Sequence, residues 1–121
     1  MEVLFIDDRL HEVMSLWRRS GCGASYVLLP LVPFTDIDAV LQLVDELHPD
    51  VICIGHGLGS EAATGADVVR ALQEAGYAGH LVANSGGGLG NFRQNGANIE
   101  FTIDRNPQQL AELLTRLSTI V

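Results

Sequence analysis

Short apolar runs alternate along this chain with longer stretches in which apolar residues recur every three or four positions. A buried strand of a parallel sheet is apolar at nearly every position, whereas a helix that packs on one side is apolar along one stripe. The continuous runs predict five strands, at residues 3–6, 26–29, 51–54, 80–83 and 99–103. A stretch with helical spacing follows each of them. The chain is therefore predicted to consist of five consecutive strand–helix units.

Residues that favour helix ends stand between these elements. Glycine and proline terminate helices, and short polar side chains cap their starts. The first helix is expected to end at Gly21 to Gly23, and the second to begin at Thr35 or Asp36 and end at His48-Pro49. The third, over 66–75, is expected to end at Gly76, and the last to begin at Asn106-Pro107. The stripes expected to face inward are Leu10, Val13, Met14 and Trp17; Ile37, Val40, Leu41, Val44 and Leu47; Val68, Val69 and Leu72; and Leu110, Leu113, Leu114 and Leu117.

The fourth helix is the weakest of the five. Residues 89–95 allow about two turns, and four glycines precede or begin them. We therefore expect a short or distorted helix there. No repeat or linker interrupts the pattern, so residues 1–121 are predicted to form one domain. The predicted fold is α/β, a three-layer (βα)5 flavodoxin-like sandwich with parallel strand order 2-1-3-4-5, and its functional crevice lies at the carboxyl ends of strands one, three and four.

Charge and cysteine content narrow the classes of function. The chain has fifteen acidic residues and seven basic ones, all seven of them arginine, and its formal net charge is -8. Such a chain is not expected to bind nucleic acid or an anionic membrane directly. Cys22 and Cys53 lack the partners of a zinc site and are expected to be reduced thiols, which suits the cytoplasm. No basic leader and no apolar run of about 18 residues is found, so neither export nor membrane anchoring is expected.

Polar residues and glycines follow four of the predicted strands. They are Asp7-Asp8, Gly55-His56-Gly57, Asn84-Ser85-Gly86 and Thr102-Ile103-Asp104. Two adjacent aspartates at a strand end can hold Mg²⁺ through their carboxylate oxygens. Equally, one can cap the following helix while the other is solvated. The residues alone leave both readings open.

Five stretches of the chain together resemble the receiver domain of two-component response regulators. VLFIDDRLHEVMSLW is similar to the family's first strand, acidic pair and first helix, and HPDVICIG to its third strand. GADVVRAL, LVANSG and GANIEFTIDRNPQQL resemble the third helix, the fourth strand with its terminal hydroxyl, and the final strand–helix unit. The resemblance runs from Val3 to about Leu117.

Carried over position by position, the resemblance places the family's metal-binding pair on Asp7 and Asp8 and its switch hydroxyl on Ser85. The phosphoacceptor aspartate falls on Gly55, and the lysine that neutralises the phosphoryl group falls on Ile103. Aspartyl phosphorylation needs both a carboxylate nucleophile and a cation. Arg105 lies two positions past Ile103, so its side chain points the same way with a different reach.

The resemblance therefore implies a degenerate receiver, or pseudo-receiver. Such a domain is expected to be a regulatory protein–protein interaction module in signalling or transcriptional control, not an enzyme, and to act without phosphorylation. Its partner would be another protein or a second copy, bound through a helical face. The family suggests the first helix, or the face made by the fourth helix, fifth strand and fifth helix. No cofactor is expected beyond weakly held Mg²⁺.

Two other functions fit parts of the sequence. The glycine-rich strand-end loops, with backbone amides that can hold an anion, suggest a module for a nucleotide or another small ligand; the candidate residues are His56, Gly57, Ser85, Gly86, Gly87 and Gly88. These loops lack the lysine of a phosphate-binding P-loop. Alternatively, Asp7 and Asp8 could form a magnesium site of a phosphate-processing enzyme, with Ser85 or His56 assisting. That reading lacks an evident nucleophile.

Overall fold

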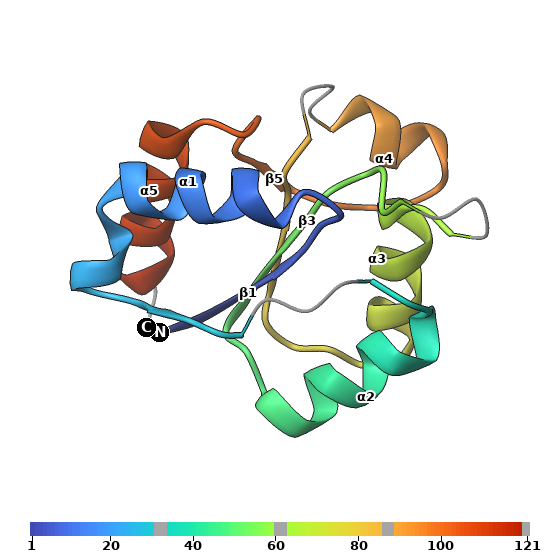
Figure 1. The fold of residues 1–121 in the computed structure, drawn as a ribbon. Coiled ribbons are helices and arrows are strands. Elements are labelled where there is room, and N and C mark those ends of the chain that lie inside the picture. Colours follow the sequence, from blue (N-terminus) through green and yellow to red (C-terminus); the bar gives the residue numbers. More distant parts are fainter. Residues whose placement is uncertain (31–33, 60–62, 86–88, 120–121) are drawn as a thin grey trace.

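The computed structural model describes residues 1–30, 34–59, 63–85 and 89–119. Within these ranges five parallel strands form one sheet in the order β2-β1-β3-β4-β5, which confirms the predicted topology (Figure 1). The strands are β1 Glu2–Ile6, β2 Val27–Leu28, β3 Val51–Ile54, β4 His80–Ala83 and β5 Phe101–Thr102. The helices are α1 Leu10–Ser20, α2 Ile37–Leu47, α3 Gly65–Glu74, α4 Gly90–Gln94 and α5 Pro107–Ser118, with a short 3-10 turn at Cys22–Ala24.

The helices cover the sheet on both sides and produce the predicted three layers. Successive side chains of a strand point to opposite faces of the sheet. Val3 and Phe5 of β1 therefore join one core with α1 and α5, whereas Leu4 and Ile6 join a second core with α2, α3 and α4. Figure 1 shows α1 and α5 together on one side of the sheet and α2 and α3 on the other.

The two edge strands are shorter than predicted. Residues 26–29 and 99–103 are apolar enough for strands of four and five residues, yet β2 and β5 span two residues each. An edge strand pairs with a single neighbour, so less backbone is held in the ladder. Ile99 is nevertheless buried in the core on the α2 and α3 side. The apolar pattern thus predicted the burial of Ile99 correctly, but not the exposure of Val27, at 54%, or the length of either strand.

One inward-facing position of α1 was assigned wrongly. Met14 is 37% exposed, while Leu16, which the predicted stripe omitted, is buried at 6% exposure. The buried stripe of α1 consists of Val13, Leu16 and Trp17. Its centre is therefore rotated away from Met14, which lies on the solvent-facing flank of the helix.

The predicted helix ends are mostly confirmed. Asp36 caps α2, since its Oδ1 accepts a hydrogen bond from the Ala39 N–H at 2.7 Å. Asn106 caps α5 by accepting from two backbone amides, and α4 is short, as expected, at five residues. The third helix begins one residue earlier than predicted, because Asp67 Oδ2 accepts from the N–H of Thr64 at 2.8 Å and fixes the first turn.

None of the helices in the described part of the chain has the length and apolar character that a membrane span requires.

Candidate functional site

The residues that follow β1, β3, β4 and β5 form a row across the sheet. The strand registers pair Ile6 with Ile54, Ile54 with Ala83, and Ala83 with Thr102. Backbone hydrogen bonds of 2.8 to 3.0 Å continue the ladder one step further. The row consists of Asp7, Gly55, Asn84 and Ile103. The positions to which the sequence assigned acidic, acceptor and lysine roles are therefore brought together.

Asp7 is the buried charge of this row. Its side chain is 1% exposed, and Oδ1 accepts a hydrogen bond from the Arg9 N–H at 3.1 Å. Among the described residues Oδ2 has no hydrogen-bond partner. Burial raises the pKa of Asp7 to about 6, against the opposing effects of the Arg9 amide and the Arg105 charge; the Asp8 carboxyl raises it further. Asp7 is therefore a carboxyl group with an unusually high proton affinity.

Gly55, at the acceptor position, directly faces this carboxyl group. A Cβ atom at position 55 would lie 2.7 Å from Oδ2 of Asp7 and 2.9 Å from its Cγ. Both distances are shorter than real Cβ contacts, so a side chain at 55 would require Asp7 to move. The carboxyl group of Asp7 thus fills the space into which a side chain at the acceptor position would project.

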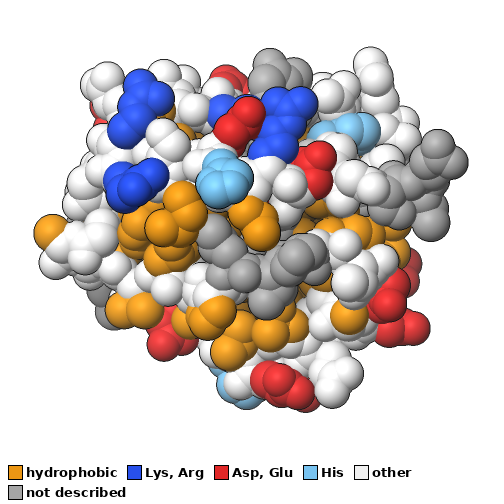
Figure 2. Space-filling view, viewed as in Figure 1, with side chains coloured by type: hydrophobic (Ala, Val, Ile, Leu, Met, Phe, Trp, Pro, Cys, Tyr) orange, Lys and Arg blue, Asp and Glu red, His pale blue; other side chains and the backbone are white. Residues whose placement is uncertain are grey.

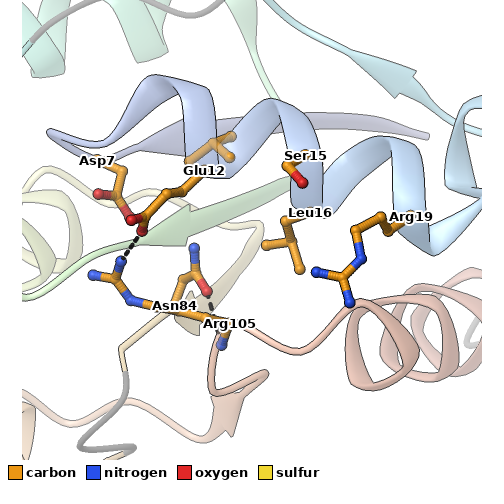
Figure 3. A pocket seen from close by; sticks show the side chains of 8 residues that line it. Asp7, Glu12, Ser15, Leu16, Arg19, Asn84 and Arg105 are labelled. Atoms are coloured by element: carbon orange, nitrogen blue, oxygen red, sulfur yellow. Dashed lines mark hydrogen bonds and ion pairs between the residues drawn. The ribbon is translucent and has the colours of Figure 1, made fainter.

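Arg105, and not Ile103, carries the positive charge of this site. Ile103 is fully buried in the core beneath α1 and α5. Arg105, two residues later, donates from Nη1 to Glu12 Oε2 at 2.9 Å, and its backbone N–H donates to Asn84 Oδ1 at 3.1 Å (Figure 3). Asp104 and Arg105 have φ angles of 45° and 55°, a left-handed conformation that non-glycine residues adopt at a cost. The sequence indicated the direction of Arg105 but not its partners.

The remaining predicted site residues lie in different surroundings. Asp8 is exposed and Ser85 is buried. The His56 ring packs edge-on against Phe92 of α4 with the ring centroids 5.5 Å apart, and Asn95 Nδ2 lies 3.4 Å from its Nε2. His56 is thus held against α4. Gly57 is exposed, and Gly86, Gly87 and Gly88 lie outside the described residues.

The residues present do not reproduce a three-carboxylate magnesium site. Within the described ranges no group of three or more His, Cys, Asp or Glu side chains could hold a metal ion. The unpartnered Oδ2 of Asp7 suits a cation, but Gly55, the predicted acceptor position, supplies no carboxylate, and the Arg105 charge acts on the same carboxyl group. Asp7 and Asp8 therefore form at most an incomplete site, and metal binding stays a prediction.

Gly65, the first residue of α3, is a site residue that the sequence analysis missed. A Cβ atom there would lie 2.1 Å from the Gly55 carbonyl oxygen, and the Gly65 N–H donates to the His56 carbonyl at 2.7 Å. The start of α3 is therefore packed against the backbone of Gly55 and His56, which we call the acceptor loop. No local sequence signal marks Gly65, because its role depends on the contact between the start of α3 and the acceptor loop.

Solved structures share this fold. The signal receiver domain of the response regulator NarL from Mycobacterium tuberculosis aligns with a TM-score of 0.69, at 17% identity, over 99% of this chain and 97% of that one. The chain has the receiver fold. The receiver domain of Francisella response regulator 1452 has the same fold, with a TM-score of 0.70, 16% identity, and coverage of 96% and 94%. The response regulator domain of Thermotoga maritima CheB aligns with a TM-score of 0.67, at 19% identity, over 98% of this chain and 93% of that one.

No protein-family model matches the chain, and no curated protein sequence matches it. At identities below 20% the structural likeness establishes the receiver fold alone. The predicted resemblance is therefore confirmed at the level of the fold. The roles assigned to Asp7, Asp8, Gly55, Ser85 and Ile103 stay predictions.

Proposed function

We propose that this receiver fold serves as a pseudo-receiver, a regulatory module in signalling or transcriptional control that acts through protein contacts and without phosphorylation. The observation that carries the proposal is the contact between Gly55 and Asp7. The acceptor position has no side chain, and the Asp7 carboxyl group fills the space that one would need.

Neither Asp7 nor the residues at and after the lysine position replace the missing chemistry. Asp7 is the remaining carboxyl group, but its free oxygen is buried and therefore poorly placed to attack a phosphoryl donor. Ile103 fills the position of the neutralising lysine, and the Arg105 guanidinium is engaged by Glu12. A catalytic role in phosphate chemistry lacks support for the same reasons, so we favour a regulatory role over an enzymatic one.

The outer face of α1 is the surface that we propose for a protein partner or a second copy. Met14 is a large hydrophobic residue of α1 that is nevertheless exposed, at 37%. His11 and Arg18 lie on the same side of α1 as Met14, at helical spacing, and both are exposed. Figure 2 views the molecule from this side and shows hydrophobic side chains gathered across the face. By contrast, α4 is too short to offer an extended surface.

The reduced state of both cysteines fits a module of the cytoplasm. Cys22 and Cys53 are free and buried in the core beneath α1 and α5. Disulfides are rare in that compartment, whereas buried thiols are common. We therefore propose a cytoplasmic location.

Phosphorylation can be tested directly with acetyl phosphate and Mg²⁺. The wild-type chain should show no mass increase of one phosphoryl group in intact-mass spectrometry. A receiver domain that keeps its acceptor aspartate serves as the positive control. A stable phosphoryl adduct that maps to the strand-end row would contradict the proposal.

The interaction surface is tested by substituting Met14. The Met14→Glu variant should lose a partner that the wild-type chain retains in affinity purification from its native cell, or lose self-association in sedimentation. Gln42→Glu adds the same charge to an exposed position of α2 and should have no effect. Equal partner retention by all three chains would exclude the α1 face.

A further inference from the structure

A groove runs along α1 on the side of the sheet that carries α5 (Figure 3). Its volume is about 220 Å³, and five of its lining residues come from α1, among them Glu12, Ser15, Leu16 and Arg19 at helical spacing. At about 1.5 Å rise per residue, this stripe is about 10 Å long. Asn84 and Arg105 line the opposite wall. We call this feature the α1 groove.

Asn84 presents a hydrogen-bond donor to the α1 groove. Asn84 is 2% exposed, and its Oδ1 already accepts the Arg105 N–H. Figure 3 shows the amide nitrogen of Asn84 directed into the groove. The side-chain hydrogen bond that Asn84 makes in the described part of the chain uses Oδ1, not the nitrogen. An amide nitrogen that faces the groove can donate to a molecule that brings an acceptor to this point.

Arg19 supplies an uncompensated positive charge at one end of the groove. Its side chain is exposed, and among the described residues it forms no ion pair. Ser15 lies one helical turn earlier on the same face. A guanidinium and a hydroxyl group at this spacing can together donate hydrogen bonds to one carboxylate.

The other end of the groove offers no free negative charge. Glu12 is paired with Arg105 at 2.9 Å and with Arg9 at 3.5 Å. Asp7 also lines the groove, but its free oxygen is buried. A cationic ligand would therefore have to displace an existing ion pair. The accessible charge of the groove is positive.

Between these polar ends the wall is apolar, formed by the buried side chains of Val13 and Leu16. The volume of about 220 Å³ lies below the roughly 300 Å³ at which pockets for drug-sized ligands begin. A nucleotide is therefore too large for the α1 groove. A short organic chain with two oxygen-bearing ends fits its size and polarity.

We infer that the α1 groove binds a small hydroxy- or oxo-carboxylic acid. Arg19 and Ser15 hold the carboxylate, Leu16 and Val13 contact the carbon chain, and Asn84 donates to the second oxygen. This site differs in place from the glycine-rich strand-end loops suggested by the sequence. It does not depend on whether the chain is phosphorylated or which protein it contacts.

The test is a titration followed by nitrogen–proton correlation NMR, with β-hydroxybutyrate as the probe. Saturable shifts are expected at the amides of α1 and of Asn84 and Arg105. The Arg19→Gln variant should bind about tenfold more weakly, as expected for the loss of a charged hydrogen bond. Arg18→Gln removes the same charge from an exposed neighbour outside the groove and should bind like the wild type.

A second variant tests the amide donor of Asn84. Asn84→Asp keeps an oxygen for the Arg105 N–H but replaces the amide donor with an acceptor, so it should weaken binding while the backbone contact persists. The uncharged β-hydroxybutyramide and inorganic phosphate should bind more weakly than the acid. The inference is overturned by an absence of saturable shifts, by equal binding of the amide or of phosphate, by unchanged binding in Arg19→Gln, or by shifts confined to His56 and Gly57.

Discussion

At the scale of single residues, Asp7 is the buried ionisable group of the strand-end row, and its charge destabilises the folded state. Its carboxyl group is buried, one of its oxygens lacks a partner among the described residues, and its pKa is about 6. Exposed carboxyl groups near it, such as Asp8, do not share this burial. A buried charge without full hydrogen bonding destabilises a fold, which is common where a site is adapted to function.

The pH dependence of stability follows from this pKa. In the unfolded chain the carboxyl group titrates near 3.8, and in the folded chain near 6. Between these values the folded state holds a proton that the unfolded state has lost, so stability falls as the pH rises from about 4 to 6. Above pH 6 the full penalty of about 3 kcal/mol is present. Asp7→Asn should therefore raise the free energy of unfolding at neutral pH by about 1–3 kcal/mol.

Urea denaturation at several pH values, with a chelator present, measures this effect. The Asp7→Asn profile should be flatter than the wild-type profile between about pH 4 and 6. Asp45→Asn, at an exposed position of α2 remote from the row, serves as the control and should leave the profile nearly unchanged. Parallel profiles for wild type and Asp7→Asn would contradict the assignment.

The contact between Gly55 and Asp7 makes a second prediction at this scale. Gly55→Ala should destabilise the fold by about 1–3 kcal/mol, because its Cβ would overlap the Asp7 carboxyl group. In an Asp7→Ala background the space is free, so the same substitution should cost much less. A double-mutant cycle on the free energy of unfolding measures the difference as a coupling energy. Additive effects of the two substitutions would show that the side chains do not compete for space.

At the scale of elements, the start of α3 connects helix packing to the strand-end row. Gly65 lies against the backbone of Gly55 and His56, and the Asp67 carboxylate fixes the first turn. Hydrogen bonding from the Thr64 amide lowers the pKa of Asp67. The start of α3 therefore packs against the backbone of the acceptor loop, and this contact does not require a side chain at position 55.

Gly65→Ala should destabilise the fold by at least about 2 kcal/mol, since the added methyl group meets a backbone carbonyl that cannot turn aside. Gly90→Ala is the matched control. Gly90 lies in α4, where an added Cβ meets no atom within 4 Å, so this variant should be neutral or more stable by up to about 1 kcal/mol. The midpoint of urea denaturation distinguishes the two. A tolerated Gly65→Ala would place α3 further from the loop.

At the scale of the whole molecule, charge is the property that acts over the longest range. The formal net charge is -8, and the ion pairs among the described residues, Arg9–Glu12, Arg70–Asp67 and Arg105–Glu12, have side chains exposed enough to contribute little. We therefore expect mutual repulsion among the acidic groups to destabilise the compact state by more than these pairs stabilise it.

Screening this repulsion should stabilise the fold. Raising the NaCl concentration from about 0.01 to 0.15 M shortens the screening length from about 30 to 8 Å and should increase Tm by a few degrees. Scanning calorimetry at constant pH measures the change. KCl at equal ionic strength should give the same increase, which separates screening from binding of one ion. A Tm that falls with salt would mean that attractive ion pairs dominate.

How far the sequence predicted this protein depends on the range of the interactions involved. The apolar runs predicted β3 and β4 at their observed bounds, because burial on both faces imposes an apolar residue at each position. The order of the five strands was predicted from the right-handed crossovers that strand–helix units make, and it is confirmed. Met14 and the lengths of β2 and β5 were predicted wrongly, since both depend on what lies beside an element rather than on its own residues.

The sequence by itself determined the alternating fold, the glycine at position 55 and the absence of any lysine, because these are properties of local pattern and residue type. Only the tertiary structure decided that the Asp7 carboxyl group fills the space beside Gly55, that Gly65 meets the Gly55 carbonyl, and that Arg105 pairs with Glu12. Each of these contacts joins segments far apart in the chain. The distances between the contacting atoms are set by strand register and helix packing, which the spacing of residues along the sequence does not reveal.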